Sequence, residues 1–358
     1  ITVTLTEQND APTVANAIAN QAINEDATMD LTFAANVFAD VDSGDSCTYT
    51  STLNGGATLP SWLTFDASSR NYGGTPLNAN VGTISVDLVC TDDGSQTATD
   101  EFDIVISNTN DAPTSSGGAA TITEDNTYNG WTAASNWGFS DVDDGDTMTV
   151  VKLITLPGNG ALTDTGDACA TANAACEAND LITLANLAEL VYTPLLNSNA
   201  ADTFTFQVYD GADYSSTATF TFTISAANDV PTWSGSASDV SGNEDTAISI
   251  TGSTIADVDD SSLDSMIISS TQGGTFSLAG VSGLTFANGG GDGTADNSMT
   301  FSGTVSAINT AIATITWTSA TSDDDNAVLS LIANDGDGNS ATDEVAITVN
   351  SVNDVPTW

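Results

Sequence analysis

Short runs of alternating apolar and polar residues recur along the whole chain. Residues 203–209 and 219–224 show the alternation best, with Phe, Val or Ile at every second position. This period of two is typical of strands with one buried face. Only residues 184–190 and 305–312 instead space their apolar residues by three or four, which predicts two brief helical turns that each run into a strand. The pattern predicts an all-β protein built from short strands.

One phrase, Asn-Asp-(Ala/Val)-Pro-Thr, follows a strand-like run four times, at residues 9–13, 110–114, 228–232 and 353–357. The copies are 101 (110−9), 118 (228−110) and 125 (353−228) residues apart, and units of that size are domains. The predicted parts are a segment 1–9, repeat 1 (10–110), repeat 2 (111–228) and repeat 3 (229–358). Strand runs at this spacing favour β-sandwiches. The segment 1–9 resembles the final strand of a preceding repeat, or a donor strand that pairs with another subunit.

The charge narrows the possible partners. Two basic residues face 48 acidic ones, giving a net charge of −46, which opposes binding to nucleic acid or to anionic membranes. Only 8 of the acids are Glu, so 40 (48−8) are Asp. Short carboxylates in turns hold oxygen-loving cations, although Asp is also simply a good turn former.

Disorder is excluded because 40% of the residues are hydrophobic and they alternate in strand runs. No apolar run is long enough to span a membrane. The start at Ile1 fits a processed or partial chain.

The four cysteines allow three pairings. Pairing within a repeat is the simplest, and it predicts Cys47–Cys90 and Cys169–Cys176. The first pair would tie two packed strands together, as in immunoglobulin-like sandwiches. Disulfides favour an oxidising, extracellular or cell-surface location.

Acidic residues recur in the same order in each repeat. A Glu-Asp pair comes first, then Asp-Val-Asp, and last an Asp-Gly or Asp-Asp-Gly before the final strand. Asp-x-Asp on an extended segment places both carboxylates on one side, where they repel unless a cation lies between them. The landmarks are Glu25, Glu124 and Glu244; then residues 40–42, 141–143 and 257–259; then Asp92, Asp210 and Asp335.

This order and spacing resemble cadherin-type calcium-binding repeats, and more closely the cadherin-like tandem repeats of giant bacterial surface adhesins. Residues 58–114 are similar to the dystroglycan-type variant, and repeat 2 is similar to the bacterial adhesin variant. The resemblance implies three tandem immunoglobulin/cadherin-like β-sandwich domains in an extended array, with Ca²⁺ between neighbouring repeats.

The resemblance also implies the ligands. The upstream repeat supplies Glu, the linker supplies Asn-Asp, and the downstream repeat supplies Asp-x-Asp and the late Asp. The implied set between repeats 1 and 2 is Glu25, Asn110, Asp111, Asp141, Asp143 and Asp210. Between repeats 2 and 3 it is Glu124, Asn228, Asp229, Asp257, Asp259 and Asp335, with Asp202 as a further candidate. The first linker has Asn9, Asp10, Asp40, Asp42 and Asp92, and the last has Glu244, Asn353 and Asp354 with Asp323 or Asp325.

Repeat 1 has no acid near Asn80, where these repeats carry a further acid pair. The resemblance therefore implies that its junction holds fewer ions.

Three classes of function remain open. The leading hypothesis is a calcium-rigidified extracellular structural or adhesive protein, a stalk segment of a large surface adhesin whose partners are neighbouring repeats. Filament assembly by strand complementation between identical subunits is an alternative. A module that binds glycans or proteins through exposed Trp131, Trp137, Trp233 or Trp358 is another, whereas Trp62 and Trp317 are expected in the core. An enzyme is not expected, because His and the common catalytic motifs are absent from the sequence.

Overall fold

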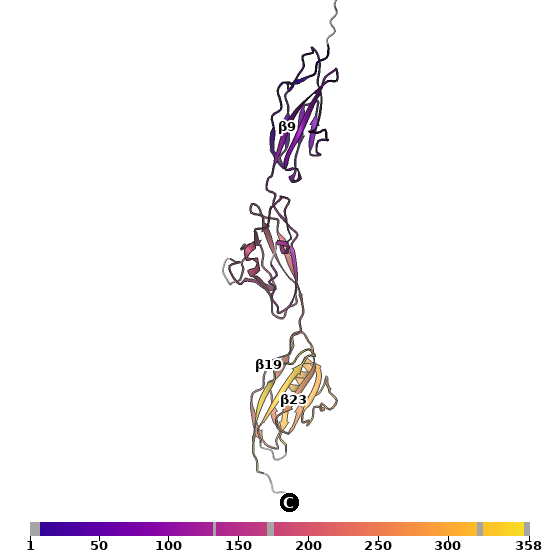
Figure 1. Ribbon diagram of the computed structural model, residues 1–358. Helices are drawn as coiled ribbons and strands as arrows, with labels where there is room; N and C mark the ends of the chain where they lie inside the picture. The colour runs from indigo at the N-terminus through magenta and orange to yellow at the C-terminus, as the bar shows by residue number, and fades with distance from the viewer. Residues whose placement is uncertain (1–7, 132–133, 170–174, 321–324, 354–358) are drawn as a thin grey trace, which may run out of the picture. The chain divides into compact units, whose positions relative to one another are not determined.

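The computed structural model describes residues 8–131, 134–169, 175–320 and 325–353. One compact unit runs up to Ala120 and includes Tyr128–Tyr192 and Asp202–Phe222; the other comprises Thr121–Thr127, Thr193–Ala201 and the chain from Thr223 onward. Among the described residues, the strands fall into three sets that share no sheet, β1–β9, β10–β18 and β19–β29 (Figure 1), and each set is described below under the name of the repeat that contains it. The proposed donor strand at residues 1–6 lies outside the described residues.

Repeat 1 is a sandwich of a four-stranded sheet, β2-β9-β8-β5, and a three-stranded sheet, β3-β7-β6, with a short β1-β4 pair beside them. The core lies between the two larger sheets, where Tyr72 of β7 meets Phe102 of β9 edge to face at 5.5 Å. The first and last strands of the larger sheet, β2 and β9, pair in parallel. The strands are β1 Thr13–Val14, β2 Gln21–Asn24, β3 Met29–Thr32, β4 Phe38–Ala39, β5 Thr48–Leu53, β6 Leu63–Asp66, β7 Asn71–Gly74, β8 Gly82–Thr91 and β9 Thr97–Ser107.

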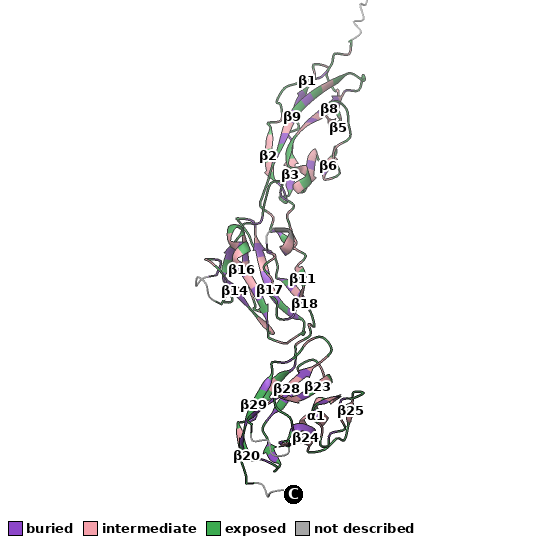
Figure 2. Cartoon of the chain, turned by 60° about the horizontal axis from the view of Figure 1, so that its bottom comes forward, coloured by how far each residue is buried: buried purple, intermediate pink, exposed green. Residues whose placement is uncertain are grey.

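Repeat 2 has a five-stranded sheet, β11-β18-β17-β13-β15, and two-stranded sheets β14-β16 and β10-β12. Tyr192 of β16 stacks on Phe222 of β18 with ring centroids 3.7 Å apart. Buried and less buried residues alternate along β17, as predicted (Figure 2). The strands are β10 Thr114–Ser115, β11 Gly118–Thr123, β12 Phe139–Ser140, β13 Val150–Leu153, β14 Gly160–Asp164, β15 Leu181–Thr183, β16 Leu190–Pro194, β17 Asp202–Tyr209 and β18 Ala218–Ser225.

Repeat 3 pairs a six-stranded sheet, β20-β29-β28-β23-β26-β25, with a three-stranded sheet, β21-β27-β24, and a β19-β22 pair. Trp317 of β27 and Leu331 of β28 belong to one buried cluster between the sheets. β20 and β29 pair in parallel, like β2 and β9. The strands are β19 Thr232–Gly235, β20 Val240–Asn243, β21 Ile248–Ile250, β22 Thr254–Ala256, β23 Ser262–Ser270, β24 Thr275–Leu278, β25 Leu284–Phe286, β26 Met299–Thr304, β27 Ile315–Thr318, β28 Ala327–Asn334 and β29 Asp343–Asn350.

Both predicted helical turns are present. The first is a 3₁₀ helix, η3 (Leu184–Glu189), which leads into β16, and the second is the α-helix α1 (Val305–Ile312). Thr304 begins α1 by accepting a hydrogen bond from the Ala307 amide, as an N-cap residue does. Two further 3₁₀ helices are η1 (Asn78–Asn80) and η2 (Ala134–Trp137). None of the helices in the described part of the chain has the length and apolar character needed to cross a bilayer.

Both predicted disulfides are present, Cys47–Cys90 and Cys169–Cys176. The expectation that the first would tie strands of two packed sheets was wrong. Cys47 directly precedes β5 and Cys90 lies in β8, and these strands are neighbours in one sheet, with Tyr49 opposite Cys90. The disulfide therefore joins adjacent strands at one end of their sheet.

Two of the tryptophans suggested as exposed binding residues are core residues. Trp131 and Trp137 are fully buried in repeat 2, with their rings stacked 5.2 Å apart. Trp317 is buried as predicted, and Trp62 and Trp233 are half-buried. Trp358 lies outside the described residues. The glycan-binding hypothesis thus loses two of its four candidate side chains.

Candidate metal centres at the repeat linkers

The same arrangement of side chains recurs at the repeat linkers. The Glu of each repeat lies against the start of the linker that follows. In each case the Glu amide donates a hydrogen bond to the last strand of its own repeat, and the carboxylate accepts one from a linker amide. Glu25, Glu124 and Glu244 are 2%, 2% and 5% exposed. Their carboxylates accept from the amides of Thr109, Ala227 and Val352 at 2.9, 2.8 and 2.6 Å, respectively.

The linker Asp is held by the downstream Asp-Val-Asp loop. In each of the first three linkers, its amide donates to the second Asp of that loop at 2.7 Å, and the second Asp donates through its own amide to the first. The linker pairs are Asp10–Asp42, Asp111–Asp143 and Asp229–Asp259. The loop pairs are Asp42–Asp40, Asp143–Asp141 and Asp259–Asp257, at 2.9, 3.0 and 3.0 Å.

The linker Asn is held by the late Asp. Its side-chain amide donates to that carboxylate in each of the first three linkers, and the pairs are Asn9–Asp92, Asn110–Asp210 and Asn228–Asp335, at 3.0, 3.3 and 2.9 Å. In the first linker, a Cβ atom at Gly94 would collide with the Asn9 side chain, so the Gly of the late Asp-Asp-Gly leaves room for the linker.

These contacts define three clusters. The first cluster is Asn9, Asp10, Asp40, Asp42, Asp45 and Asp92. The second cluster is Glu25, Asn110, Asp111, Asp141, Asp143, Asp146 and Asp210. The third cluster is Glu124, Asn228, Asp229, Asp257, Asp259, Asp260 and Asp335. With the exception of Asp202, the structure thus brings together the side chains that the sequence assigned to these three linkers.

Carboxylate oxygens converge most closely in the first and second clusters. One oxygen from each of Glu25, Asp111 and Asp143 lies within 4.8 Å of the others. Asp141, Asp146 and Asp210 form a second such group, and Asp40, Asp42 and Asp45 form a third. Glu25 belongs to repeat 1 whereas Asp143 belongs to repeat 2, so the first of these groups combines carboxylates from both.

Several of these oxygens are buried without a hydrogen-bond donor. A buried carboxylate oxygen without a partner is costly, so native structures rarely keep one. A bound cation would supply the missing partner of such an oxygen. The atoms are Glu25 Oε2, Asp40 Oδ2, Asp45 Oδ2, Asp141 Oδ2, Asp229 Oδ2 and Asp257 Oδ2, and all belong to the three clusters.

The carboxyl pKa values show the same excess of negative charge. Burial, followed by repulsion from Asp26, Asp143 and Asp141, raises the pKa of Asp111. Burial and neighbouring carboxylates likewise raise the pKa values of Asp45, Asp146, Asp229 and Asp260.

Two of the late aspartates, Asp210 and Asp335, show the opposite shift. The Asn228 amide and backbone amides lower the pKa of Asp335. Burial alone would raise the pKa of Asp210, but backbone amides and Asn110 lower it.

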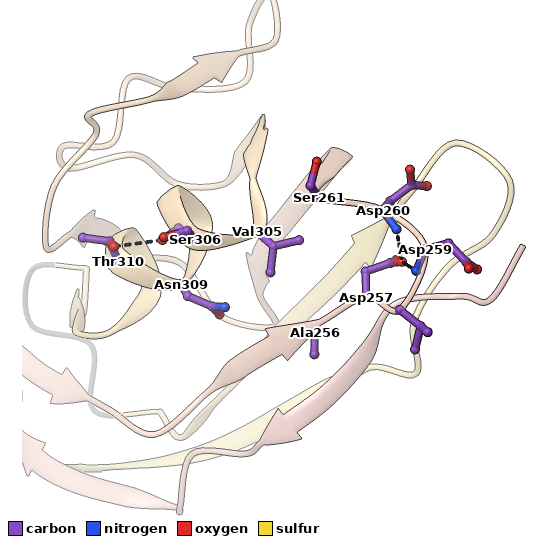
Figure 3. A pocket seen from close by; sticks show the side chains of 10 residues that line it. Ala256, Asp257, Asp259, Asp260, Ser261, Val305, Ser306, Asn309 and Thr310 are labelled. Atoms are coloured by element: carbon purple, nitrogen blue, oxygen red, sulfur yellow. Dashed lines mark hydrogen bonds between the residues drawn. The ribbon is translucent and has the colours of Figure 1, made fainter. Parts of the chain in front are cut away.

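The third cluster has a different loop. Repeats 1 and 2 read Asp-Val-Asp-x-Gly-Asp, but repeat 3 reads Asp257-Val258-Asp259-Asp260-Ser261-Ser262 and lacks the last acid. Asp260 follows directly in this loop, and its amide donates to Asp257 Oδ1 beside the amide of Asp259 (Figure 3). The loop faces an open cavity of about 840 Å³, whose other wall is α1 with Ser306, Asn309 and Thr310.

Sequence reasoning missed several contributors. Asp26 and Asp125 lie close enough to the linker Asp to raise its pKa, and both have left-handed φ angles, 60° and 62°. Asp45, Asp146 and Asp213 were also missed, although the repeated Asp-Val-Asp-x-Gly-Asp pattern could have revealed the first two. Asp213 shares the Asn110 side-chain amide with Asp210.

Asn78 was missed for a different reason. Its side-chain amide donates to Asp143 Oδ1 at 2.7 Å, from the corner of repeat 1 where an acid was expected and absent. Nothing in the sequence near Asn78 indicates that this corner meets the Asp-Val-Asp loop of repeat 2.

Other assigned residues lie apart from these clusters. Asp202 is 4% exposed and accepts hydrogen bonds from the amides of Gly158 and Asn159 and from the Tyr192 hydroxyl, all within repeat 2. Glu244 lies at the final linker near Asn353, and Asp325 is an exposed residue before β28. Asp323 and Asp354 lie outside the described residues.

The fold and its linkers define a chain of tandem immunoglobulin-like repeats of the kind found in bacterial surface proteins. Residues 11–107 match the family described as "Putative Ig domain", and residues 110–223 match the family described as "Bacterial Ig domain". Domains of this kind are typically extracellular and non-enzymatic. No curated protein matches the sequence.

Several solved structures are similar to the chain. Repeats EC22–24 of mouse cadherin-23 are 15% identical, with 96% of this chain and 100% of that one covered and a TM-score of 0.45. Protocadherin gamma B2 is 14% identical, with 97% and 61% covered and a TM-score of 0.44. An endo-fucoidan hydrolase of glycoside hydrolase family 107 is 18% identical, with 96% and 45% covered and a TM-score of 0.25. The family matches cover residues 11–107 and 110–223, whereas repeat 3 is identified by its own pair of packed sheets.

Proposed function

We propose that this chain is an extracellular structural or adhesive repeat protein whose linkers are stiffened by calcium, and that it forms a stalk segment of a larger surface protein. The proposed repeats are 10–110, 111–228 and 229–358. The observation that carries the proposal is the convergence of buried, unpartnered carboxylate oxygens at the linkers.

The donor set fits calcium. Ca²⁺ takes about six to eight oxygen ligands from carboxylates, amide carbonyls and water, in flexible geometry. In the second cluster Glu25, Asp111 and Asp143 would hold one ion, and Asp141, Asp146 and Asp210 would hold another. When bound, the ions supply positive charge that offsets the repulsion among these carboxylates.

The proposed stiffening follows from which parts of the chain supply the ligands. Glu25 is fixed to the end of repeat 1 through Thr109, whereas Asp143 is fixed in the loop of repeat 2. Bending at the linker would separate these ligands, so an ion bound to both resists bending. The same reasoning applies to Glu124 and the Asp-Val-Asp loop of the third cluster.

The test combines thermal melting with small-angle scattering, with calcium and after chelation. Calcium that binds only the folded form stabilises it by mass action, and stiff linkers narrow the distribution of end-to-end distances. We expect chelation to lower the melting temperature and broaden that distribution, and calcium but not sodium to restore both. Identical melting and scattering with and without chelator would contradict the proposal.

A further inference from the structure

Two chain segments, here called limbs, carry the acids of the first cluster on either side of the Cys47–Cys90 disulfide. Cys47 lies two residues after Asp45, and Cys90 lies two residues before Asp92. One limb is the Asp-Val-Asp loop that leads into β5, and the other is the turn that follows β8. The covalent bond therefore joins the segments that carry the first-cluster acids.

A small cavity lies between the disulfide and these acids. It has a volume of about 160 Å³, and both cysteines line it together with Asp40, Asp45 and Asp92. Asp40 and Asp45 each contribute a buried oxygen without a hydrogen-bond partner. Asp92 is 7% exposed, so its carboxylate is also largely removed from solvent. A disulfide thus forms part of the wall of a cavity where negative charge is concentrated.

Repeat 2 provides a comparison within the same chain. Met148 lies two residues after Asp146, and Val208 lies two residues before Asp210, at the offsets that Cys47 and Cys90 occupy in repeat 1. Both are buried, at 1% and 0% exposure. The limbs of the second cluster therefore lie next to apolar packing residues, whereas those of the first cluster are joined covalently.

We propose that the Cys47–Cys90 disulfide sets the calcium affinity of the first cluster by holding the Asp45 and Asp92 limbs together against their mutual repulsion. This inference rests on the proposed function. Without the bond, the limbs separate in the calcium-free protein, and binding must then bring them back together. Preorganised ligands avoid that cost, and disturbing the residues that support metal ligands typically weakens binding about 10- to 100-fold.

The bond is open to reduction because Cys47 is only half-buried. A dithiol reagent exchanges with the disulfide, is itself oxidised to a cyclic disulfide, and leaves each cysteine sulfur protonated as a thiol. Two electrons and two protons pass from reagent to protein. Calcium binding at the first cluster, and not at the second or third, then depends on the redox state.

The experiment titrates Ca²⁺ into the full chain and follows binding by calorimetry. A second titration uses Tb³⁺ and follows its luminescence, which Tyr49, another residue lining the cavity, sensitises. The test variant is Cys47→Met/Cys90→Val, which installs the residues of repeat 2. Asp40→Asn identifies the binding phase of the first cluster, and Cys169→Ser/Cys176→Ser removes the other disulfide as a control. We expect the dissociation constant of the first cluster to rise about tenfold or more in the test variant, and the other phases to stay unchanged.

The outcomes separate the inference from the proposed function. An unmodified chain that binds no Ca²⁺ at any cluster would refute both. Binding that is present, but equally tight in the first cluster with and without the bond, would refute the inference alone. If the test variant does not fold, the dithiol-reduced chain is titrated instead, and an unchanged first phase again overturns the inference.

Discussion

Replacing Glu25 by Gln should change stability in opposite directions with and without calcium. The side chain is 2% exposed, and its Oε1 accepts the Thr109 amide while its Oε2 has no donor. Gln keeps the size and the accepting oxygen but removes one negative charge. In calcium-free protein this relieves repulsion from Asp111 and Asp143, whereas in calcium-loaded protein it removes a charged ligand.

The structure gives the magnitude. The carboxylate oxygens lie within 4.8 Å of one another, and two unit charges at that limit repel by about 3.5 kcal/mol at an effective dielectric constant of about 20. Salt and solvent reduce this value, so we expect Glu25→Gln to raise the calcium-free unfolding free energy by about 1–3 kcal/mol. Loss of one charged ligand should weaken calcium binding at least about tenfold, which corresponds to about 1.4 kcal/mol.

The assay is urea unfolding of the unmodified chain and the variant, in chelator and in saturating calcium, with Glu344→Gln as the control. Glu344 lies exposed on β29 and makes no contact with the clusters that the structure shows. The reasoning fails if Glu25→Gln destabilises the protein in chelator, or if Glu344→Gln reproduces the reversal of sign.

Three further predictions follow from the described contacts. Asn78→Leu removes the donor to Asp143 Oδ1 and should weaken calcium binding at the second cluster about tenfold, whereas equal affinity by calorimetry would show that Asn78 does not position Asp143. Calcium-free protein should lose stability as the pH rises above 3.8, because the raised carboxyl pKa values let the folded state bind more protons than the unfolded state. In saturating calcium, stability should instead increase with pH. Urea denaturation at pH 4.5 and 7, with and without chelator, measures the change of stability with pH in both conditions. The carboxyls concerned are Asp45, Asp111, Asp146, Asp229 and Asp260. Trp137→Ala should lower the free energy of unfolding by about 3–5 kcal/mol, since Trp137 is fully buried. A loss under about 1 kcal/mol in urea denaturation would mean that repeat 2 repacks to fill the space that the indole ring leaves.

Local pattern was enough to predict most of the fold. Alternation over 203–209 and 219–224 predicted β17 and β18, because a strand with one buried face needs only its own residues to show the period. The acid clusters were predictable because the same landmarks recur three times in one order. Repetition distinguished them from isolated turn-forming aspartates.

The remaining features depend on contacts between distant segments. Asn78 reaches Asp143 over 65 residues, and no local pattern encodes such a meeting. The sequence around Trp131 and Trp137 shows no alternation of apolar and polar residues, so their burial could not be inferred. The Cys47–Cys90 bond joins strands of one sheet because β5 and β8 are neighbours in the strand order, and that order is a property of the folded sheet.

The parallel pairing of β2 with β9, and of β20 with β29, determines how repeats 1 and 3 respond to mechanical load. The first strand of each pair lies toward the start of its repeat, and the second leads into the following linker. Tension applied through the linkers therefore slides the paired strands past each other, and all of their hydrogen bonds must break together instead of opening one by one. Pulling single molecules from both ends should give high rupture forces for repeats 1 and 3, and pulling across β8 and β9 at their shared turn should peel these strands apart at much lower force.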